Sequence, residues 1–470
     1  MAVFKIMVEK YLKAPVFFCH VVSKMTVEIC TVSGFNEVGR NMVAIRVDDD
    51  VVICDMGLHL ENYIKVTEDE EEDVVKLRKA ELIKAKAVPD DELIKDWKAK
   101  VKAIIPSHAH LDHLGAIPYL AHHYDAPIIG TPYTIQVLKH IINDGGLQIG
   151  NQLKVVELNS TIQISKKLQV EFVNMTHSTP HTAAIVVHTP HGAVVYANDF
   201  KLDDTPTLGK PPNYERLNEL GEAGVLAAFI DTTNADVNAK TPSEKVAKEM
   251  LSDVLLTQNH AGRGIIVTTF SSHIARLKSI IELGHKMDRK VVILGRSMYK
   301  YITAAEELQI VKFSDKAEIV KFSAKVKEKL RRIDREGKEK YLIICTGHQG
   351  EPKSVLSKIA SGTLEFNLGP QDAIVFSCRV IPTPTNKANR ERLESQLKRS
   401  NVRMFKDVHQ SGHGSGQDIK RLIEILKPKH IIPSHGEKKM KEALKHIAQG
   451  VGYDSKQVHM AYDGQRIVLS

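Results

Sequence analysis

The densest group of potential metal ligands in the sequence is a six-residue segment that reads His-Ala-His-Leu-Asp-His. It supplies His108, His110, Asp112 and His113. Imidazole nitrogens and carboxylate oxygens are ligands that suit Zn²⁺ or Mn²⁺. The segment follows an apolar run at residues 103–105, which predicts a strand, a loop and then a helix. On such a loop we expect His108 and His110 to face one ion, and Asp112 and His113 to face a second.

One hexapeptide cannot complete two metal sites, so further ligands are expected at the ends of later strands. Three candidates follow apolar runs of the strand type: His177, Asp199 and His435. Ligand sites in α/β proteins gather at the carboxyl ends of strands, which favours these three as ligands. His181 lies close to His177 but has no such support, and we do not assign it to a site.

The elements that must position these residues alternate along the chain and indicate an α/β protein. A second series of apolar runs begins near residue 225, at residues 226–230, 264–269, 291–294, 341–345 and 373–377. Each ends in a small or polar loop, as in an open parallel sheet. Two charged segments, residues 66–100 and 316–340, are predicted to be solvated helices. Their alternative roles are a docking surface and a nucleic-acid-facing surface, respectively.

Composition narrows the class of protein further. The chain has 470 residues, 43% of them hydrophobic and 26% charged, which excludes wholesale disorder. No apolar run reaches the length of a membrane span, so no membrane partner is expected. A net charge of +8 permits a polyanionic partner. Five scattered cysteines without a CxxC pair argue against a disulfide framework and favour the cytoplasm.

The N-terminus differs from the rest of the chain. Residues 1–24 contain a short apolar stretch without an Ala-x-Ala cleavage pattern, so no signal peptide is predicted. A clean period-two strand pattern starts after Met25. We therefore expect folded structure to begin near Met25, with residues 1–24 as a disordered extension or a misassigned start.

The HxHxDH segment, followed by His177, Asp199 and a late His435, resembles the metallo-β-lactamase fold. The segment between Asp199 and His435 resembles the β-CASP insertion of nucleic-acid-processing members. Gly-Arg-Ser-Met at 295–298, Thr-Gly-x-Gln-Gly-Glu-Pro at 346–352 and the Ser-Gly-His motif are similar to ribonuclease J. The shorter chain and its acidic insertion resemble the archaeal branch of that family.

This resemblance implies an α/β fold, a metallo-β-lactamase αββα sandwich with an inserted β-CASP α/β domain. Residues 25–230 would form the first part of the sandwich domain, including the charged insertion at 66–100. Residues 231–400 would form the β-CASP domain, and residues 401–470 the second part of the sandwich domain.

The resemblance also implies a two-metal phosphodiesterase that binds zinc, with manganese as the alternative. One ion would be held by His108, His110 and His177, the other by Asp112, His113 and His435, and Asp199 would bridge them. Asp55 would support the site without being a ligand. His413 would protonate the leaving 3′ oxygen or stabilise the transferred charge, oriented by Asp231.

The implied activity is 5′→3′ exonucleolytic hydrolysis of single-stranded RNA with a 5′-monophosphate, by a homodimer active in RNA processing. The candidate contacts to RNA phosphates are Ser411, Gly412, His413, Gly347, His348, Gly350, Ser271, Ser272 and Arg379. His348 stands where bacterial relatives usually have serine. The contacts to the 5′ nucleotide in those relatives are therefore the part of the resemblance that applies least directly to this chain.

Four other functions remain open on the same fold. An endoribonuclease of the cleavage-factor type would use the same metals, but no GXXG-bearing KH domain precedes Met25. A small-molecule thioesterase would not need the long inserted domain. A DNA repair nuclease would share the motifs, and a non-catalytic RNA-binding subunit would be expected to lack some of the ligands.

Overall fold

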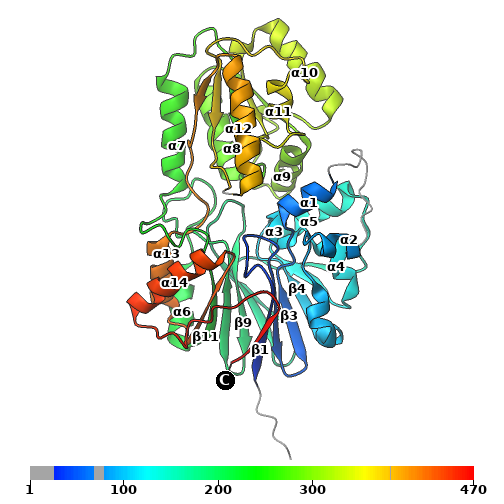
Figure 1. Ribbon diagram of the computed structural model, residues 1–470, viewed down its shortest axis with the longest axis vertical. Coiled ribbons are helices and arrows are strands. Elements are labelled where there is room, and N and C mark those ends of the chain that lie inside the picture. The colour runs from blue at the N-terminus through cyan, green and yellow to red at the C-terminus, as the bar shows by residue number, and fades with distance from the viewer. Residues whose placement is uncertain (1–25, 68–78, 382, 470) are drawn as a thin grey trace, which may run out of the picture.

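The computed structural model describes residues 26–67, 79–381 and 383–469. The predicted extension at residues 1–24 and the acidic block at 68–73 lie outside the described residues. The described chain forms two bodies, a sandwich below and a parallel α/β body above it (Figure 1).

Two sheets form the sandwich. The first has the order β19 (Gln465–Leu469), β1 (Val27–Ser33), β2 (Met42–Val47), β3 (Asp50–Cys54), β4 (Val101–Ile105), β5 (Ile128–Gly130) and β6 (Leu153–Val155). The second has the order β18 (His430–Ser434), β11 (Val225–Asp231), β10 (Gly192–Ala197), β9 (Ala183–Thr189), β8 (Gln169–Asn174) and β7 (Ser160–Gln163). Their facing sides share one apolar core, which includes Ile29, Val52, Phe172 and Phe229.

Helices cover the outer faces of both sheets. The first sheet carries α1 (Leu60–Thr67), α2 (Lys79–Lys84), η1 (Asp91–Lys100), α3 (Leu111–Leu114), α4 (Ile117–Leu120), η2 (Ala121–His123) and α5 (Pro132–Asp144). The second carries α6 (Tyr214–Ala223), α13 (Gly416–Leu426) and α14 (Lys438–Val451). The αββα sandwich predicted from the sequence is therefore confirmed.

The upper body is a parallel sheet with helices on both faces. Its strand order is β14 (Ala317–Val320), β13 (Lys290–Leu294), β15 (Tyr341–Cys345), β12 (Ile265–Thr268), β16 (Ala373–Phe376) and β17 (Arg403–Phe405). One face packs α7 (Glu244–Ser252), η3 (Asp253–Thr257), α8 (Ile274–Lys286) and α9 (Arg296–Glu307). The other packs α10 (Ser323–Glu336), α11 (Val355–Ala360) and α12 (Pro384–Arg399), with η4 (Lys338–Lys340) between α10 and β15.

Strand β11, which covers residues 226–230, lies in the sandwich, within the range 25–230 that the resemblance implied for that domain, and pairs with β18 about two hundred residues later. Two charged segments differ from the solvated helices expected for them. The described part of residues 66–100 contains α2 and η1, and η1 buries Ile94 and Trp97. Residues 316–340 are not one helix, because β14 precedes α10 and forms the edge of the third sheet. The domain division at residues 230 and 400 remains a proposal, and β17 pairs with β16 just beyond residue 400.

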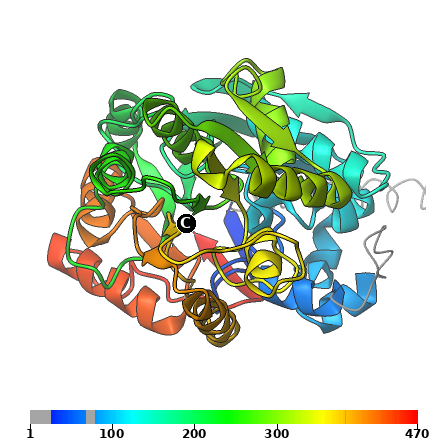
Figure 2. The same cartoon turned by 90° about the horizontal axis from the view of Figure 1, so that it is seen from above.

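The strand register explains why distant motifs meet. Neighbouring parallel strands β3 and β4 pair Cys54 with Ile105, so the residues that follow them emerge at the same edge. In the second sheet, β10, β11 and β18 are also parallel neighbours, and Asp231 pairs with Ser434. Seen from above, most N-terminal helices (blue and cyan) lie on the opposite side of the sandwich from α13 and α14 (orange and red), although the C-terminal strand β19 pairs with β1 (Figure 2). Both sides therefore supply residues to the edge beneath the upper body.

No helix in the described ranges combines the length and the apolar character required to cross a membrane.

Candidate metal centre

The hexapeptide forms the loop between β4 and α3, with its last residues in the short helix. Backbone bonds from Met56 N to His113 O (2.7 Å) and from Leu58 N to Leu111 O (2.9 Å) tie α3 to the loop that follows β3. His108 and His113 are fully buried. The two loops thus support each other and direct the hexapeptide side chains toward the second sheet.

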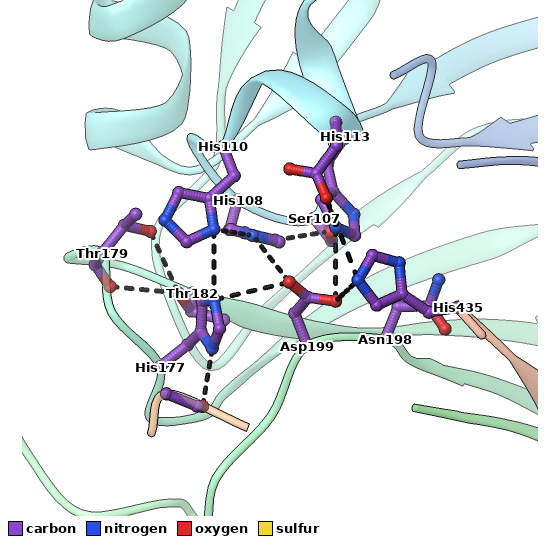
Figure 3. Close-up of polar contacts among 12 residues, drawn as sticks. Ser107, His108, His110, His113, His177, Thr179, Thr182, Asn198, Asp199 and His435 are labelled. Carbon is purple, nitrogen blue, oxygen red and sulfur yellow. Dashed lines mark hydrogen bonds and ion pairs between the residues drawn. The ribbon is translucent and has the colours of Figure 1, made fainter. Parts of the chain in front are cut away.

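A first set of donor atoms comes from three different segments of the chain. His110 Nδ1 lies 3.0 Å from His108 Nε2 and 3.1 Å from His177 Nε2. Asp199 Oδ2 lies 3.6 Å from His108 Nε2 and 3.4 Å from His177 Nε2. All of these donor atoms lie within 4.8 Å of one another, and they converge in Figure 3. Three imidazoles and a carboxylate at this spacing fit one divalent ion.

A second set of donor atoms lies on the other side of Asp199. Asp199 Oδ1 lies 3.3 Å from both His113 Nε2 and His435 Nε2. Asp112 Oδ2 lies 3.6 Å from His113 Nε2 and 3.8 Å from His435 Nε2. The seven residues that the sequence singled out as ligands therefore fall into the two sets expected from it, with Asp199 common to both.

Asp199 provides the test of whether these residues fit a metal ion. Its side chain is 1% exposed, and among the described residues Oδ1 has no well-aligned hydrogen-bond donor. A buried carboxylate oxygen without a donor costs free energy unless a cation compensates it. A divalent cation between the two sets would supply that compensation, so the residues present fit one.

Hydrogen bonds behind the histidines orient their ligand nitrogens. Nδ1 of His108 lies 3.0 Å from Ser107 Oγ, and Nδ1 of His177 lies 2.7 Å from Gly412 O. On the other side, Nδ1 of His113 lies 2.6 Å from Asp55 Oδ2, and Nδ1 of His435 lies 2.9 Å from Asn41 Oδ1. An acceptor at Nδ1 keeps the proton there and leaves the Nε2 lone pair available to a metal. Asp55 has the supporting position expected for it.

The electrostatics of the centre differ between its two donor sets. In the second set, burial disfavours the charged form of His113, but the carboxylates of Asp199, Asp55 and Asp112 outweigh it and raise the pKa of this imidazole well above its usual range, so a metal ion there would displace its proton.

In the first set, burial lowers the pKa of His108 and His177, and lowers the pKa of His110 to about 4. Burial opposes ionisation of Asp199, but the surrounding imidazoles outweigh it and lower the pKa of that carboxyl group well below its usual range. Neutral imidazoles and an ionised carboxylate are the forms that bind divalent metals.

Three residues of the centre have backbone conformations that side chains rarely adopt. Asp55, Asp199 and His435 have φ values of 60°, 49° and 55° and follow β3, β10 and β18, respectively. Non-glycine residues in the left-handed region carry strain, which concentrates at functional sites where the surrounding structure enforces it. Here the left-handed turn directs each side chain back toward the common edge.

His413 and Asp231 lie beside the two donor sets. His413 Nδ1 is 2.7 Å from Asp231 Oδ2, while His413 Nε2 is 4.0 Å from Asp199 Oδ2. Burial disfavours the charged imidazole, but the carboxylates of Asp231 and Asp199 outweigh it and raise the pKa of His413 to about 9. The pair therefore presents a protonated imidazole toward the centre in the metal-free protein.

Besides His413, three of the predicted phosphate contacts lie at the centre. Ser272 Oγ is 3.1 Å from His110 Nε2, and Ser411 Oγ accepts a hydrogen bond from His413 N at 3.1 Å. Gly412 packs against His177, because a Cβ there would lie 2.1 Å from Ser178 Oγ and 3.0 Å from His177 Cε1. The loop at residues 411–413 thus contacts His177 of the first donor set and carries the candidate acid, His413.

The other candidates lie farther along the carboxyl edge of the third sheet. Gly347, His348 and Gly350 follow β15, Ser271 follows β12, and Arg379 follows β16. These three strands are neighbours, so the loops lie next to one another. Close packing requires glycine at two of these positions, because a Cβ at Gly347 would meet Ser354 Oγ at 2.6 Å, and one at Gly350 would meet Asn389 O at 2.3 Å.

Two residues that hydrogen-bond to the candidate ligands were not predicted from the sequence. Asn41 accepts from His435, donates to Asp112 O at 3.0 Å and lies 3.2 Å from His113 Nε2. It comes from the loop between β1 and β2, far from every motif. Ser107 precedes His108 directly, and its position between the β4 strand and the hexapeptide could have suggested its role.

Three family models match successive parts of the chain. They are the beta-lactamase superfamily domain at residues 85–214, the ribonuclease J beta-CASP domain at 262–393 and the Zn-dependent metallo-hydrolase RNA specificity domain at 400–460. Fold and site together define a metallo-hydrolase of the β-lactamase superfamily that carries a β-CASP domain. Ribonuclease J of Methanocaldococcus jannaschii is 43% identical over 443 residues, which are 94% of this chain and 98% of that protein. The chain belongs to the ribonuclease J family and is a metal-dependent ribonuclease.

Further comparisons agree with this assignment. Ribonuclease J of Pyrococcus abyssi is 42% identical over 94% of this chain and 97% of its own length. Ribonuclease J 1 of Streptococcus pyogenes is 31% identical over 94% of this chain and 74% of its own length. A crystal structure of a protein of unknown function from Enterococcus faecalis V583 superposes with a TM-score of 0.64 at 17% identity, covering 94% of this chain and 100% of that one. That last similarity concerns the fold alone.

Proposed function

We propose that this ribonuclease degrades or processes single-stranded RNA from its 5′ end, with a preference for a 5′-monophosphate. The observation that supports the hydrolytic centre is the position of Asp199. Its two carboxylate oxygens face two sets of donors, and the His413–Asp231 pair lies beside them. The 5′→3′ direction rests on the resemblance to ribonuclease J.

We further propose two divalent ions per chain, zinc by preference and manganese as the alternative. His108, His110 and His177 would hold one, and Asp112, His113 and His435 the other, with Asp199 between them. When bound, two such ions supply Lewis-acid charge to a phosphodiester and lower the pKa of a water to about 7.

His413 is the proposed acid for the leaving 3′ oxygen. Asp231 accepts from Nδ1 and fixes the ring, so Nε2 is the nitrogen that points toward the centre. A positioned, protonated imidazole can donate its Nε2 proton as the P–O bond breaks, which contributes about 10²- to 10⁴-fold to a rate. Thr233, whose N and Oγ1 both donate to Asp231 Oδ1, holds that carboxylate in place.

The proposed site for the 5′ end is the loop at residues 346–350 after β15. This strand lies next to β12, whose following loop brings Ser272 to His110. His348 is buried there, and its Nδ1 has no hydrogen-bond partner among the described residues. A terminal phosphate held at this loop would sit at a fixed distance from the centre, which would favour removal of one nucleotide at a time.

Two expectations on cellular context also stand as proposals. A cytoplasmic location is supported by Cys30, Cys54, Cys345 and Cys378, which are free thiols in the described residues. A homodimer rests on the family resemblance, and sedimentation analysis of the purified chain tests it. A monomer at micromolar concentration would contradict the dimer.

The decisive experiment uses a 5′-labelled RNA that carries a 5′-monophosphate, with a 5′-hydroxyl RNA of the same sequence as its comparison. Labelled mononucleotide should appear from the start, faster from the monophosphate, and should disappear with a chelator or with His110→Ala. The matched control is His122→Ala, because His122 is an exposed histidine outside both donor sets.

The products decide between the remaining activities. Labelled oligonucleotides as the earliest products would replace the exonuclease by an endoribonuclease. Equal rates on both 5′ ends would remove the monophosphate preference. Ser411→Ala tests the proposed contact between Ser411 and an RNA phosphate. If the variant keeps the wild-type preference for a 5′-monophosphate, Ser411 does not make that contact.

A further inference from the structure

A completely buried arginine lies next to the centre without being part of it. Arg276, in the first turn of α8, is 0% exposed. Its Nε and Nη2 donate to the two carboxylate oxygens of Glu244, at 2.5 and 2.7 Å. Its Nη1 donates to Ser377 Oγ at 2.8 Å and to Ser377 O at 3.1 Å. An arginine can be buried only when its charge and its donors are satisfied in this way.

The remaining contacts of Arg276 are with residues 409 and 410, which directly precede the loop at residues 411–413. Nη1 lies 3.2 Å from His409 Nδ1, and Nη2 donates to Gln410 O at 3.4 Å. Ser377 extends the same network, because its Oγ donates to Val408 O at 2.9 Å. One guanidinium thus binds the chain at residues 408–410 to the carboxyl end of β16.

Residues 411–413 follow immediately and contact two functional side chains. His413 binds Asp231, and Gly412 O accepts from His177 Nδ1. A shift of the preceding residues would therefore move the proposed acid and the acceptor behind one donor histidine together. The contacts of Arg276 end at residue 410, so it acts on both only through this loop.

The other end of the network reaches the segment after Asp199. Glu244 N, at the start of α7, donates to Asp203 Oδ2 at 2.8 Å. Lys201 Nζ lies 3.5 Å from Asp203 Oδ2, and Lys201 N donates to Thr176 O at 2.8 Å. Helices α7 and α8 lie side by side in the upper body (Figure 1). The Arg276–Glu244 pair therefore links the segment beside His177 and Asp199 to the segment that carries His413.

We infer that Arg276 is a positioning residue, which holds the loop at residues 409–413 so that His413 meets the reacting phosphodiester. This inference rests on the proposed role of His413. Lysine could keep the charge pair with Glu244, but a single ammonium group cannot reproduce the planar fork that serves Ser377, His409 and Gln410 together.

The test compares Arg276→Lys with Arg289→Lys. Arg289 is also buried, at 7% exposed, and donates to the backbone oxygens of His260, Arg263 and Tyr341, next to the amino end of β13. Both variants lose a buried guanidinium, but only the first should lower kcat, by about ten- to a hundredfold at saturating metal, with KM nearly unchanged. In metal-free protein, hydrogen exchange at residues 408–414 should accelerate in Arg276→Lys and stay at the wild-type rate in Arg289→Lys.

A double-mutant cycle with His413→Ala then separates positioning from general damage. In the His413→Ala background, Arg276→Lys should cause a clearly smaller fold-loss than in the wild type, because the part of its effect that acts through His413 is already removed and only the part through Gly412 and His177 remains. Multiplicative losses would overturn the inference, as would equal kcat for Arg276→Lys and wild type. If Arg276→Lys does not fold, Ser377→Ala replaces it in the double-mutant cycle. Ser377→Ala alone should lower kcat by about three- to tenfold.

The cycle also separates the role of His413 as the acid from the role of Arg276 in positioning it. Wild-type activity in His413→Ala alone would refute the proposed acid, and the positioning role with it. A large loss in His413→Ala combined with multiplicative behaviour would leave the acid in place and refute only the role of Arg276.

Discussion

Asp231 Oδ2 lies 2.7 Å from His413 Nδ1, although 182 positions separate the two residues in the chain. Asp231 ends β11, and His413 lies in the loop before α13, with the whole upper body inserted between them. The hydrogen bond thus joins the two segments that flank the insertion in the chain. It makes the protonation of His413 depend on a carboxylate from the end of β11.

Asp231→Asn should lower kcat by about 10²- to 10⁴-fold without loss of bound metal. Asp231 is one of the carboxylates that raise the pKa of His413 to about 9, so the variant should have a lower pKa at this residue. A general acid works in its protonated form, and activity falls as pH rises through its pKa. The alkaline limb of the kcat profile should therefore move to lower pH in the variant.

Asp236→Asn is the control for this substitution, because Asp236 lies on the same segment but is exposed and pairs with the exposed Lys439 at 3.7 Å. Its pH profile should match that of the wild type. An unchanged alkaline limb in Asp231→Asn would mean that His413 does not supply the proton.

Asp199→Asn and His110→Ala should differ in the number of ions they lose. Asp199 belongs to both donor sets, whereas His110 belongs to one. After gel filtration, elemental analysis should find both ions depleted in Asp199→Asn and about one ion retained in His110→Ala. Cleavage should fall by more than about 10³-fold in each. Two ions per chain in purified Asp199→Asn would rule out its bridging position.

Removal of metal should destabilise the folded protein. Binding to the native state contributes about 4 kcal/mol when free ligand exceeds its Kd a thousandfold. Buried histidines and carboxylates without a cation lose that contribution, so a chelator should lower the Tm by about 5 °C or more. The shift should be smaller in His110→Ala and unchanged in His122→Ala. Equal Tm values with and without chelator would argue against a structural contribution of the centre.

Glu171 provides a pH-dependent contribution to stability outside the centre. It is 4% exposed, and His188 Nε2 and Arg216 Nε lie 2.8 and 2.7 Å from its carboxylate oxygens. Burial opposes ionisation, yet these two partners outweigh it and lower the pKa of Glu171 to about 2 from an ordinary 4.5. Because the folded pKa is depressed, this contribution is complete above pH 4.5 and is lost as pH falls toward 2.

Glu171→Gln should therefore lower stability at pH 7 by about 1–2 kcal/mol, after allowance for solvent screening of the partly exposed partners. Thermal melts should show the difference from wild type shrinking below pH 4.5. Glu219→Gln is the matched control, since Glu219 also binds Arg216, at 2.6 Å, but has a half-exposed side chain. A constant difference at every pH would show that packing, not charge, is responsible.

The seven proposed ligands could be found in the sequence because local order and chemical type identify them. The hexapeptide concentrates four donors, and each later ligand follows an apolar run that became a strand. A strand ending at a sheet edge places its next residues at that edge, whatever packs elsewhere. The same reasoning predicted β12, β13, β15 and β16 of the upper body.

Contacts between distant segments could not be found in this way. The pairing of β11 with β18 is one example, because an apolar run does not specify its partner strand. Asn41, which supports His435, belongs to a loop that no motif distinguishes. The close packing of Gly347 against Ser354 and of Gly350 against Asn389 likewise depends on segments whose contacts the sequence pattern does not specify.

Residue type and spacing pointed to the candidate ligands and to an α/β chain, because ligand chemistry and strand periodicity are local properties of the sequence. The family and the αββα sandwich with its insertion came from the resemblance of these motifs to ribonuclease J. Only the folded protein placed Asp231 against His413 and Arg276 between Glu244 and the loop at residues 409–413. Those contacts arise where separate sheets and helices pack, and burial then determines which charges must pair.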